Sequence, residues 1–184
     1  KYGHGVGIAV SPTGACHMNS VHDSAYQDDV GITPLKPLGV YEPLPLDDLS
    51  TAKMHMVRKA MMWRINYNLT GICSFHSWSP TQTVELIEAI TGWNTSVMEL
   101  WLAAERAYDM ARAFNAREGF TRKDDVLPPR LFEALSEGPM AGKVYDVETF
   151  NVAIDKLYEL MSWHPVTGAP TRAKLEDLDV AWVG

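Results

Sequence analysis

The residue best suited to metal chemistry is Cys73, which follows a predicted helix in the segment Gly71-Ile72-Cys73. A thiolate beside a helix end can ligate an iron–sulfur cluster, because backbone N–H groups there stabilise the bridging sulfur atoms. A [4Fe–4S] cluster needs four such ligands, and the only other cysteine is Cys16, 57 positions earlier. The alternative is that Cys73 is a small buried hydrophobic residue, which its residue type alone favours.

A second candidate is His17, which follows the turn Ser11-Pro12-Thr13-Gly14-Ala15. Such a ring can project into a cavity as a proton donor or hydrogen-bond donor. His4 and His22 lie nearby and raise the prospect of a metal, but spacings of 13 and 5 residues match no standard zinc pattern. The alternative is a capped turn in which the ring of His17 bonds a backbone carbonyl, and residue type alone favours it.

A third candidate is the charged run from Arg112 to Asp125. Its basic residues at a predicted helix C-terminus complement the helix dipole, and its Arg and Asp residues can fix a chain reversal through ion pairs. Acidic groups within the run weaken an anion-binding role. We therefore interpret most of this run as structural.

Helices must position these residues. Residues 49–66 lack Gly and Pro, which predicts a helix that ends near Asn68. Apolar residues recur there at intervals of three and four and should form one apolar face: Met54, Val57, Met61, Met62 and Ile65. Pro80 predicts a helix over about 80–92, and a capping box from Ser96 to Glu99 predicts one over 97–117. The apolar side of the latter is expected to contain Leu100, Trp101, Ala104, Tyr108, Ala111 and Phe114. A loop with helical pieces over 120–148, a helix over about 148–163 and a short helix after Pro170 are expected to follow. Residues 47–184 are thus expected to form a multihelical, all-α domain.

Residues 1–46 precede this domain and are predicted to be irregular. The apolar stretch Val6–Val10 lies in a Gly-rich, His-rich segment and suggests a strand or irregular structure. Four prolines forbid a regular helix over 31–47, which predicts an extended connector on the surface of a larger body.

Composition excludes several classes of protein. The net charge of −7 argues against a nucleic-acid surface, and no apolar run approaches the roughly 20 residues of a membrane span. Two cysteines form no disulfide framework, so a cytoplasmic location is expected. The chain starts without Met inside a Gly-rich segment, which indicates a fragment of a larger protein.

The charged run resembles a characteristic segment of the tungsten-pterin aldehyde:ferredoxin oxidoreductase family. The match continues through Leu127–Arg130, Gly138-Pro139, Leu157-Tyr158, Trp163 and Gly168–Thr171, and it covers the chain from about Gly5 to its end. The resemblance implies a multihelical C-terminal part of a larger enzyme.

Site residues follow from the same resemblance. The family's Asp-x-x-Gly-Leu-Cys motif corresponds to Asn68 through Cys73, which implies that Cys73 is the fourth [4Fe–4S] ligand and that Asn68, Gly71 and Ile72 lie at the pterin. The element before His17 resembles one whose His approaches the tungsten, with Asn19 where the family usually has a basic residue. Asn68 replaces an Asp, which keeps an acceptor but loses the charge.

The resemblance implies oxidation of an aldehyde to a carboxylic acid at a tungsten bis-molybdopterin site. Electrons would pass through one [4Fe–4S] cluster to ferredoxin, and the other three cluster ligands would lie in a missing N-terminal part of the enzyme. The isolated chain is expected to bind no cofactor and to be inactive. Whether the metal is tungsten or molybdenum and whether the enzyme is a homo-oligomer stay open.

Two alternatives remain. One is a relative that reduces an aromatic acyl-CoA with the same cofactor, which residues 112–125 fit less well. The other is a cofactor-free helical domain that binds a partner protein. Analysis of the iron and tungsten content of the full-length protein would distinguish the cofactor-free domain from the two enzymes.

Overall fold

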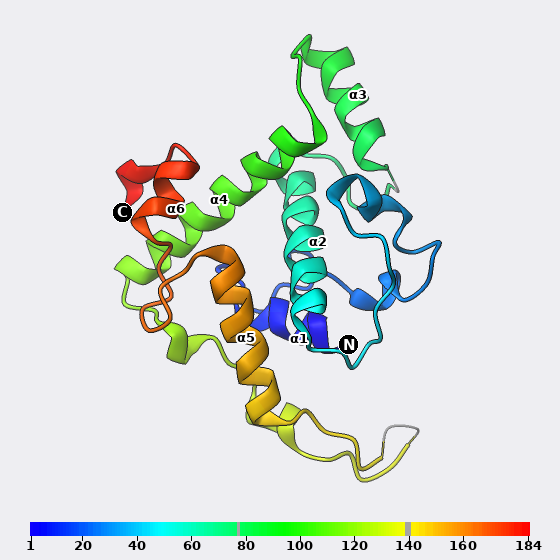
Figure 1. Ribbon diagram of the computed structural model, residues 1–184, viewed down its shortest axis with the longest axis vertical. Helices are drawn as coiled ribbons and strands as arrows, with labels where there is room; N and C mark the ends of the chain where they lie inside the picture. The colour runs from blue at the N-terminus through cyan, green and yellow to red at the C-terminus, as the bar shows by residue number, and fades with distance from the viewer. Residues whose placement is uncertain (77, 139–140) are drawn as a thin grey trace.

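The computed structural model describes residues 1–184 except 77 and 139–140, so the predicted family match at Pro139 lies outside the described residues. The described residues form α-helices and 3₁₀ helices and no strand, which confirms the predicted all-α class (Figure 1). No helix in the described part of the chain is long and apolar enough to cross a membrane.

The helix α2 (Thr51–Thr70) lies at the centre of the molecule (Figure 1). The side chain of Ser50 caps its start by accepting from the backbone N–H of Lys53, and Gly71 ends it with a φ of 71°. Helices α1, α4 and α5 pack against it, so apolar residues are buried around most of its circumference. They include all those predicted to line its apolar face: Met54, Val57, Met61, Met62 and Ile65.

Helices α3 (Pro80–Thr91) and α4 (Val97–Arg117) begin where their caps predict. Ser79 and Gln82 form a complete capping box. The box predicted at Ser96 is half formed: Ser96 accepts from the backbone of Glu99, whose carboxylate bonds Thr95 instead.

The buried face of α4 differs from the predicted one. It contains Trp101, Ala104 and Tyr108 as expected, but Phe114 is 54% exposed, and Asp109 and Arg112 are buried in its place. Polar groups take these positions because partners on other elements bond them, which no helical periodicity can indicate.

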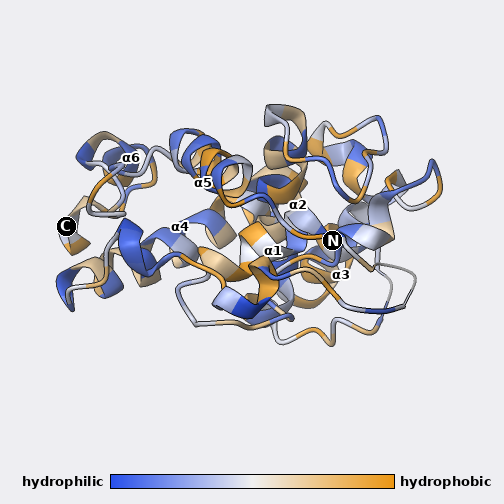
Figure 2. Cartoon of the chain, turned by 90° about the horizontal axis from the view of Figure 1, so that it is seen from below, coloured by the Kyte–Doolittle hydropathy of each residue, from blue (hydrophilic) through white to orange (hydrophobic). Residues whose placement is uncertain are grey.

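At the N-terminus the prediction of strand or irregular structure was wrong, because Tyr2–Ala9 form the helix α1. Its glycines allow close packing and do not break the helix. A Cβ on Gly3 would lie 2.8 Å from a methyl group of Val57, and one on Gly7 would lie 2.4 Å from Oγ of Ser20. Figure 2 shows apolar residues concentrated where α1 meets α2.

The proline-rich connector is folded more tightly than predicted. Within the connector Thr33–Leu38 form a short 3₁₀ helix, and Ile32 and Leu35 are buried. Pro37 lies inside this helix, whose few hydrogen bonds tolerate a residue without an N–H. A second short 3₁₀ helix, Asp23–Tyr26, lies before the connector.

The C-terminal third follows the prediction. Short 3₁₀ helices at Arg122–Asp124 and Pro129–Phe132 interrupt the loop after α4, and α5 (Val147–Met161) and α6 (Arg172–Asp177) follow. A 3₁₀ helix at Ala181–Val183 ends the described chain.

Candidate functional site

Cys73 lies on an exposed turn that follows α2 directly. Gly71 reverses the chain in the left-handed conformation, Ile72 is half-buried, and the carbonyl of Cys73 accepts from the backbone N–H of His76 at 3.1 Å. The thiol is unpaired and exposed. The alternative that Cys73 is a buried hydrophobic residue is therefore wrong, and its sulfur is accessible to a ligand.

His17 lies on the exposed loop of residues 11–20, which we call the His17 loop. Among the described residues no backbone carbonyl accepts from its ring, so the alternative of a carbonyl-bonded His is not borne out. The ring centroid of His17 lies 5.8 Å from that of His22, which lies 4.2 Å from that of His4. The three imidazoles thus gather, although the described residues contain no group of three His, Cys, Asp or Glu able to hold a metal.

The two neighbouring rings favour the neutral state. Burial lowers the pKa of His4 to about 4, with a further contribution from His22. Burial also lowers the pKa of His22, followed by the charge of Lys1. Neutral His22 can then accept from the ammonium of Lys1, whose Nζ lies 3.2 Å from its Nδ1.

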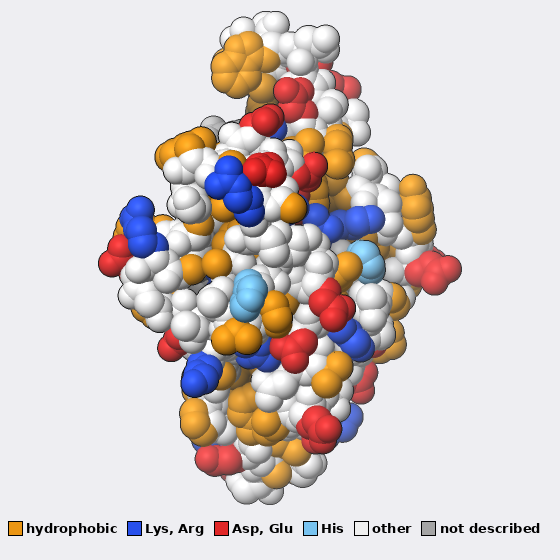
Figure 3. Space-filling view, turned by 60° about the vertical axis from the view of Figure 1, so that its left-hand side comes forward, with side chains coloured by type: hydrophobic (Ala, Val, Ile, Leu, Met, Phe, Trp, Pro, Cys, Tyr) orange, Lys and Arg blue, Asp and Glu red, His pale blue; other side chains and the backbone are white. Residues whose placement is uncertain are grey.

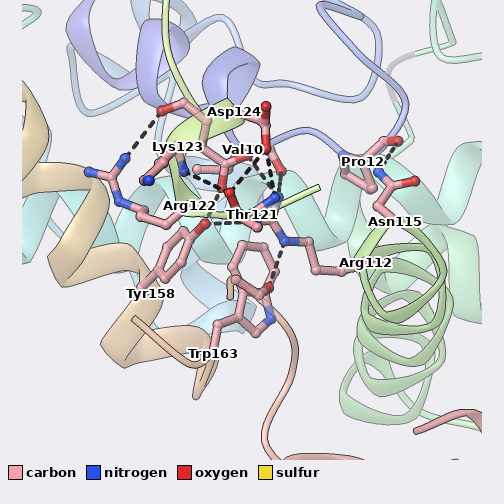
Figure 4. A network of polar contacts seen from close by, with 12 residues as sticks. Val10, Pro12, Arg112, Asn115, Thr121, Arg122, Lys123, Asp124, Tyr158 and Trp163 are labelled. Carbon is pink, nitrogen blue, oxygen red and sulfur yellow. Dashed lines mark hydrogen bonds and ion pairs between the residues drawn. The ribbon is translucent and has the colours of Figure 1, made fainter. Parts of the chain in front are cut away.

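Two helices hold the His17 loop. From α4, Nδ2 of Asn115 donates to the carbonyl of Pro12 at 2.8 Å (Figure 4), and the hydroxyl of Tyr108 donates to that of Val10 at 3.2 Å. From α2, Nε of Arg64 donates to the carbonyl of Met18 at 3.1 Å. The contribution of Arg64 was not predicted, because nothing in the sequence indicates a partner 46 positions away.

Asn19 and Asn68 meet where this loop reaches the end of α2. Nδ2 of the exposed Asn68 donates to Oδ1 of the half-buried Asn19 at 2.6 Å. The structure thus brings together two residues that the sequence assigned separately to the cofactor. It also connects the loop of His17 to the helix that leads to Cys73.

The charged run predicted to be structural forms a buried network (Figure 4). Arg112 pairs with Asp125 through the two terminal nitrogens of its guanidinium, and the hydroxyl of Tyr158 bonds both partners. The guanidinium carbon lies 4.6 Å from the ring centroid of Trp163, and Nε donates to the carbonyl of Gly168 at 2.8 Å. This network joins α4 to α5 and to the turn before α6, next to the start of the His17 loop.

A hollow of about 410 Å³ separates the His17 loop from this run, lined on one side by Ser11, Pro12 and Ala15 and on the other by Asn115 and Asp125. Charged side chains of both signs are interspersed on the face shown in Figure 3, without a continuous basic patch.

The sequence is similar to a known protein family and to curated members of it. The family model described as aldehyde ferredoxin oxidoreductase, domains 2 & 3, matches residues 1–180. The tungsten-containing aldehyde ferredoxin oxidoreductases of Thermococcus kodakarensis and Pyrococcus furiosus are each 27% identical over 183 residues, which cover 97% of this chain. The chain spans 28% of the length of each of these relatives.

A solved structure has a similar fold. The active site complex BamBC of benzoyl coenzyme A reductase, in complex with 1,5-dienoyl-CoA, superposes with a TM-score of 0.62 at 22% identity. The superposition covers 88% of this chain and 26% of that chain. The family match over nearly all residues decides the assignment, and this chain belongs to the aldehyde ferredoxin oxidoreductase family, in the region of its domains 2 and 3.

Proposed function

We propose that this chain is the C-terminal part of an enzyme that oxidises aldehydes to carboxylic acids at a tungsten bis-molybdopterin site. Electrons leave through one [4Fe–4S] cluster to ferredoxin. The observation that carries the proposal is the accessible thiol of Cys73, on a turn joined through α2, Asn68 and Asn19 to the loop of His17. The names of the 27% identical relatives support the same activity.

The described residues fit one corner of such a cofactor site. An exposed, unpaired thiol can ligate iron. The described part of the chain offers no set of three metal ligands, so the other ligands must come from the remaining part of the enzyme. In our proposal Cys73 is the fourth ligand of the cluster, and Gly71, Ile72, Asn68 and Asn19 contact the pterin.

When bound, the cofactor supplies an acceptor for the two electrons that an aldehyde and water release on forming a carboxylic acid. His17 acts on the substrate oxygen. Its ring is held on a loop fastened by α2 and α4, and it donates a hydrogen bond as negative charge develops on that oxygen. Preorganisation of this donor lowers the barrier, because no reorganisation is needed during the reaction.

The partners proposed for the enzyme are its own remaining part, ferredoxin and the aldehyde, with a homo-oligomer as a further option. We place it in the cytoplasm, because a reducing compartment preserves unpaired thiols such as those of Cys16 and Cys73.

A second candidate function is reduction of an aromatic acyl-CoA, which the fold of the benzoyl coenzyme A reductase complex supports. Aldehyde-dependent reduction of a viologen dye by the complete enzyme tests the first function, and acyl-CoA-dependent oxidation of the reduced dye tests the second. Iron and tungsten analysis tests the third idea, a cofactor-free domain, which absence of both metals would favour.

Substitution of Cys73 tests the cluster assignment. In the complete enzyme Cys73→Ala should lower the iron content by roughly four atoms and abolish electron output, because a [4Fe–4S] cluster needs four ligands. Cys16→Ala is the matched control and should retain its iron. Full iron content in the Cys73 variant would contradict the assignment.

A further inference from the structure

Asn19 and Asn68 belong to a continuous series of side-chain hydrogen bonds. Asn68 donates to Oδ1 of Asn19 at 2.6 Å, and Nδ2 of Asn19 donates to the hydroxyl oxygen of Thr13 at 2.7 Å. That oxygen lies 3.2 Å from Oγ of Ser11. Because an amide offers both a donor and an acceptor, Asn19 can bond the helix on one side and its own loop on the other.

The amide pair lies between the two residues that the proposed function uses. Asn19 is two positions after His17, and Asn68 is five positions before Cys73. The last turn of α2 and the left-handed Gly71 fix the path from Asn68 to Cys73. Any displacement of Asn19 relative to Asn68 therefore changes the position of the His17 loop relative to the Cys73 turn.

This contact differs from the other hydrogen bonds that hold the loop. Arg64 and Asn115 donate to the backbone carbonyls of Met18 and Pro12, which any residue type at those positions would offer. The Asn19–Asn68 bond instead depends on the side chain at both ends. The identities of the two residues are therefore coupled.

We propose that Asn19 and Asn68 act as one positioning unit, which sets the His17 loop against the Cys73 turn and tolerates exchange of both residues but not of one alone. The functional part rests on the proposed function, whereas the contact does not. An Asp at position 68 would face the carbonyl oxygen of Asn19, and a Lys at position 19 would face the amide donor of Asn68. Together the two substitutions restore a donor opposite an acceptor, as an ion pair.

The experiment compares four variants of the complete enzyme with the wild type: Asn68→Asp, Asn19→Lys, the double variant, and Asn94→Asp. Asn94 is an exposed residue between α3 and α4 and serves as the control for an added carboxylate. The measured quantity is the hydrogen-exchange rate of the backbone amides of residues 13–20, and aldehyde oxidation by the wild type is measured separately.

In each single variant the backbone amides of residues 13–20 should exchange about fivefold faster than in the wild type, because coupled contacts have interaction energies of this order. The double variant should return these rates to within about twofold of the wild type, and Asn94→Asp should match the wild type.

The proposal would be overturned if the change in exchange rate in the double variant equalled the product of the changes in the two single variants. Unchanged exchange in both single variants would overturn it as well. An equal effect in Asn94→Asp would also overturn it, because added charge would then be the cause. If the wild-type enzyme oxidises no aldehyde, the proposed function fails, and the exchange rates still decide whether the two positions are coupled.

Discussion

At the scale of single residues, the site consists of accessible side chains on short, fixed segments. Cys73 and His17 are both exposed in this chain, which the proposed roles at a cofactor and a substrate require. Their segments are fixed by neighbours, since Gly71 ends α2 and Arg64 holds the carbonyl of Met18. The reactive groups are thus free while the backbone that carries them is not.

The proposed role of His17 predicts a loss of rate without loss of cofactor. In the complete enzyme His17→Ala should lower kcat by roughly 10²-fold, which is the usual cost of removing a donor to a developing oxyanion. Tungsten and iron contents should stay unchanged, and His55→Ala, at an exposed position on α2, should behave as the wild type. Undiminished turnover of the His17 variant would exclude this role.

The buried carboxyl of Asp109 should make the stability of the fold depend on pH. Its side chain is buried, one oxygen accepts from Nε1 of Trp163 at 2.7 Å, and the other lacks a hydrogen-bond partner among the described residues. Burial raises the pKa of this carboxyl from 3.8 to about 7. The folded state therefore keeps a proton that the unfolded state has released, and the free energy of unfolding contributed by this group falls as pH rises from about 4 to 7.

Asp109→Asn removes this ionisation. Between pH 4 and pH 8 the free energy of unfolding should therefore fall by up to about 4 kcal/mol less in the variant than in the wild type, since one pKa unit corresponds to about 1.4 kcal/mol. Thermal unfolding of wild type and variant at both pH values measures the difference. Identical pH dependence in the two proteins would show that Asp109 is not the group responsible.

At the scale of elements, local caps begin the helices and buried polar contacts join them. Ser50, Ser79 and Thr171 each accept a hydrogen bond from a backbone N–H in the first turn of the helix that follows. The pair Arg112–Asp125 connects α4 to the segment after it. Because Tyr108 and Asn115 on the same helix hold the start of the His17 loop, α4 positions the site although it contributes no group to the chemistry.

Loss of the buried pair should destabilise this arrangement strongly. Arg112→Met leaves the carboxylate of Asp125 buried without its cation, which costs about 3–5 kcal/mol in comparable buried pairs. The midpoint of thermal unfolding should fall by roughly 10 °C for a chain of this length.

Arg130→Met is the matched control, because it breaks an exposed pair with Glu133 in which both side chains are 62% exposed. Surface pairs contribute about 0–1 kcal/mol, so its midpoint should barely change. Equal shifts in the two variants would show that burial does not determine the contribution of Arg112.

At the scale of the whole molecule, the surface around Cys73 is incompletely covered. Phe75 is 87% exposed, Leu69 48% and Trp78 39%. The chain spans 28% of the length of its curated relatives, and we propose that the remaining part of the enzyme covers these side chains. The same contact would supply the missing ligands of the cluster.

If the remaining part of the enzyme covers Phe75, a substitution there should affect the complete enzyme more than this chain alone. Phe75→Ser should lower the unfolding midpoint of the complete enzyme, because burial of a Phe side chain contributes about 1.5–3 kcal/mol. The same change in this chain alone should have little effect. Val166→Ser, on the turn before α6 where the side chain is 66% exposed, provides the comparison. Equal shifts of the midpoint in both contexts would argue against coverage at Phe75.

The sequence by itself determined the helical class, the positions of α2 to α6 to within a few residues and the residues buried on α2. These features depend on hydrogen bonds between residues within one helical turn and on apolar periodicity, and both are local. The charged run was also interpreted correctly as structural, and the family was identified from its residues.

Only the tertiary structure decided that Cys73 is exposed, that the glycines of α1 lie against α2 and Ser20, and that Asn19 meets Asn68. Each of these depends on segments that lie far apart in the chain, 49 positions in the case of the two asparagines. Residue type favoured burial for the cysteine and irregular structure for the glycines. Close packing of α1 against α2 and Ser20 explains the glycines, whereas no described element packs over the turn of Cys73, which leaves its thiol exposed. Composition carries no information about which surfaces touch.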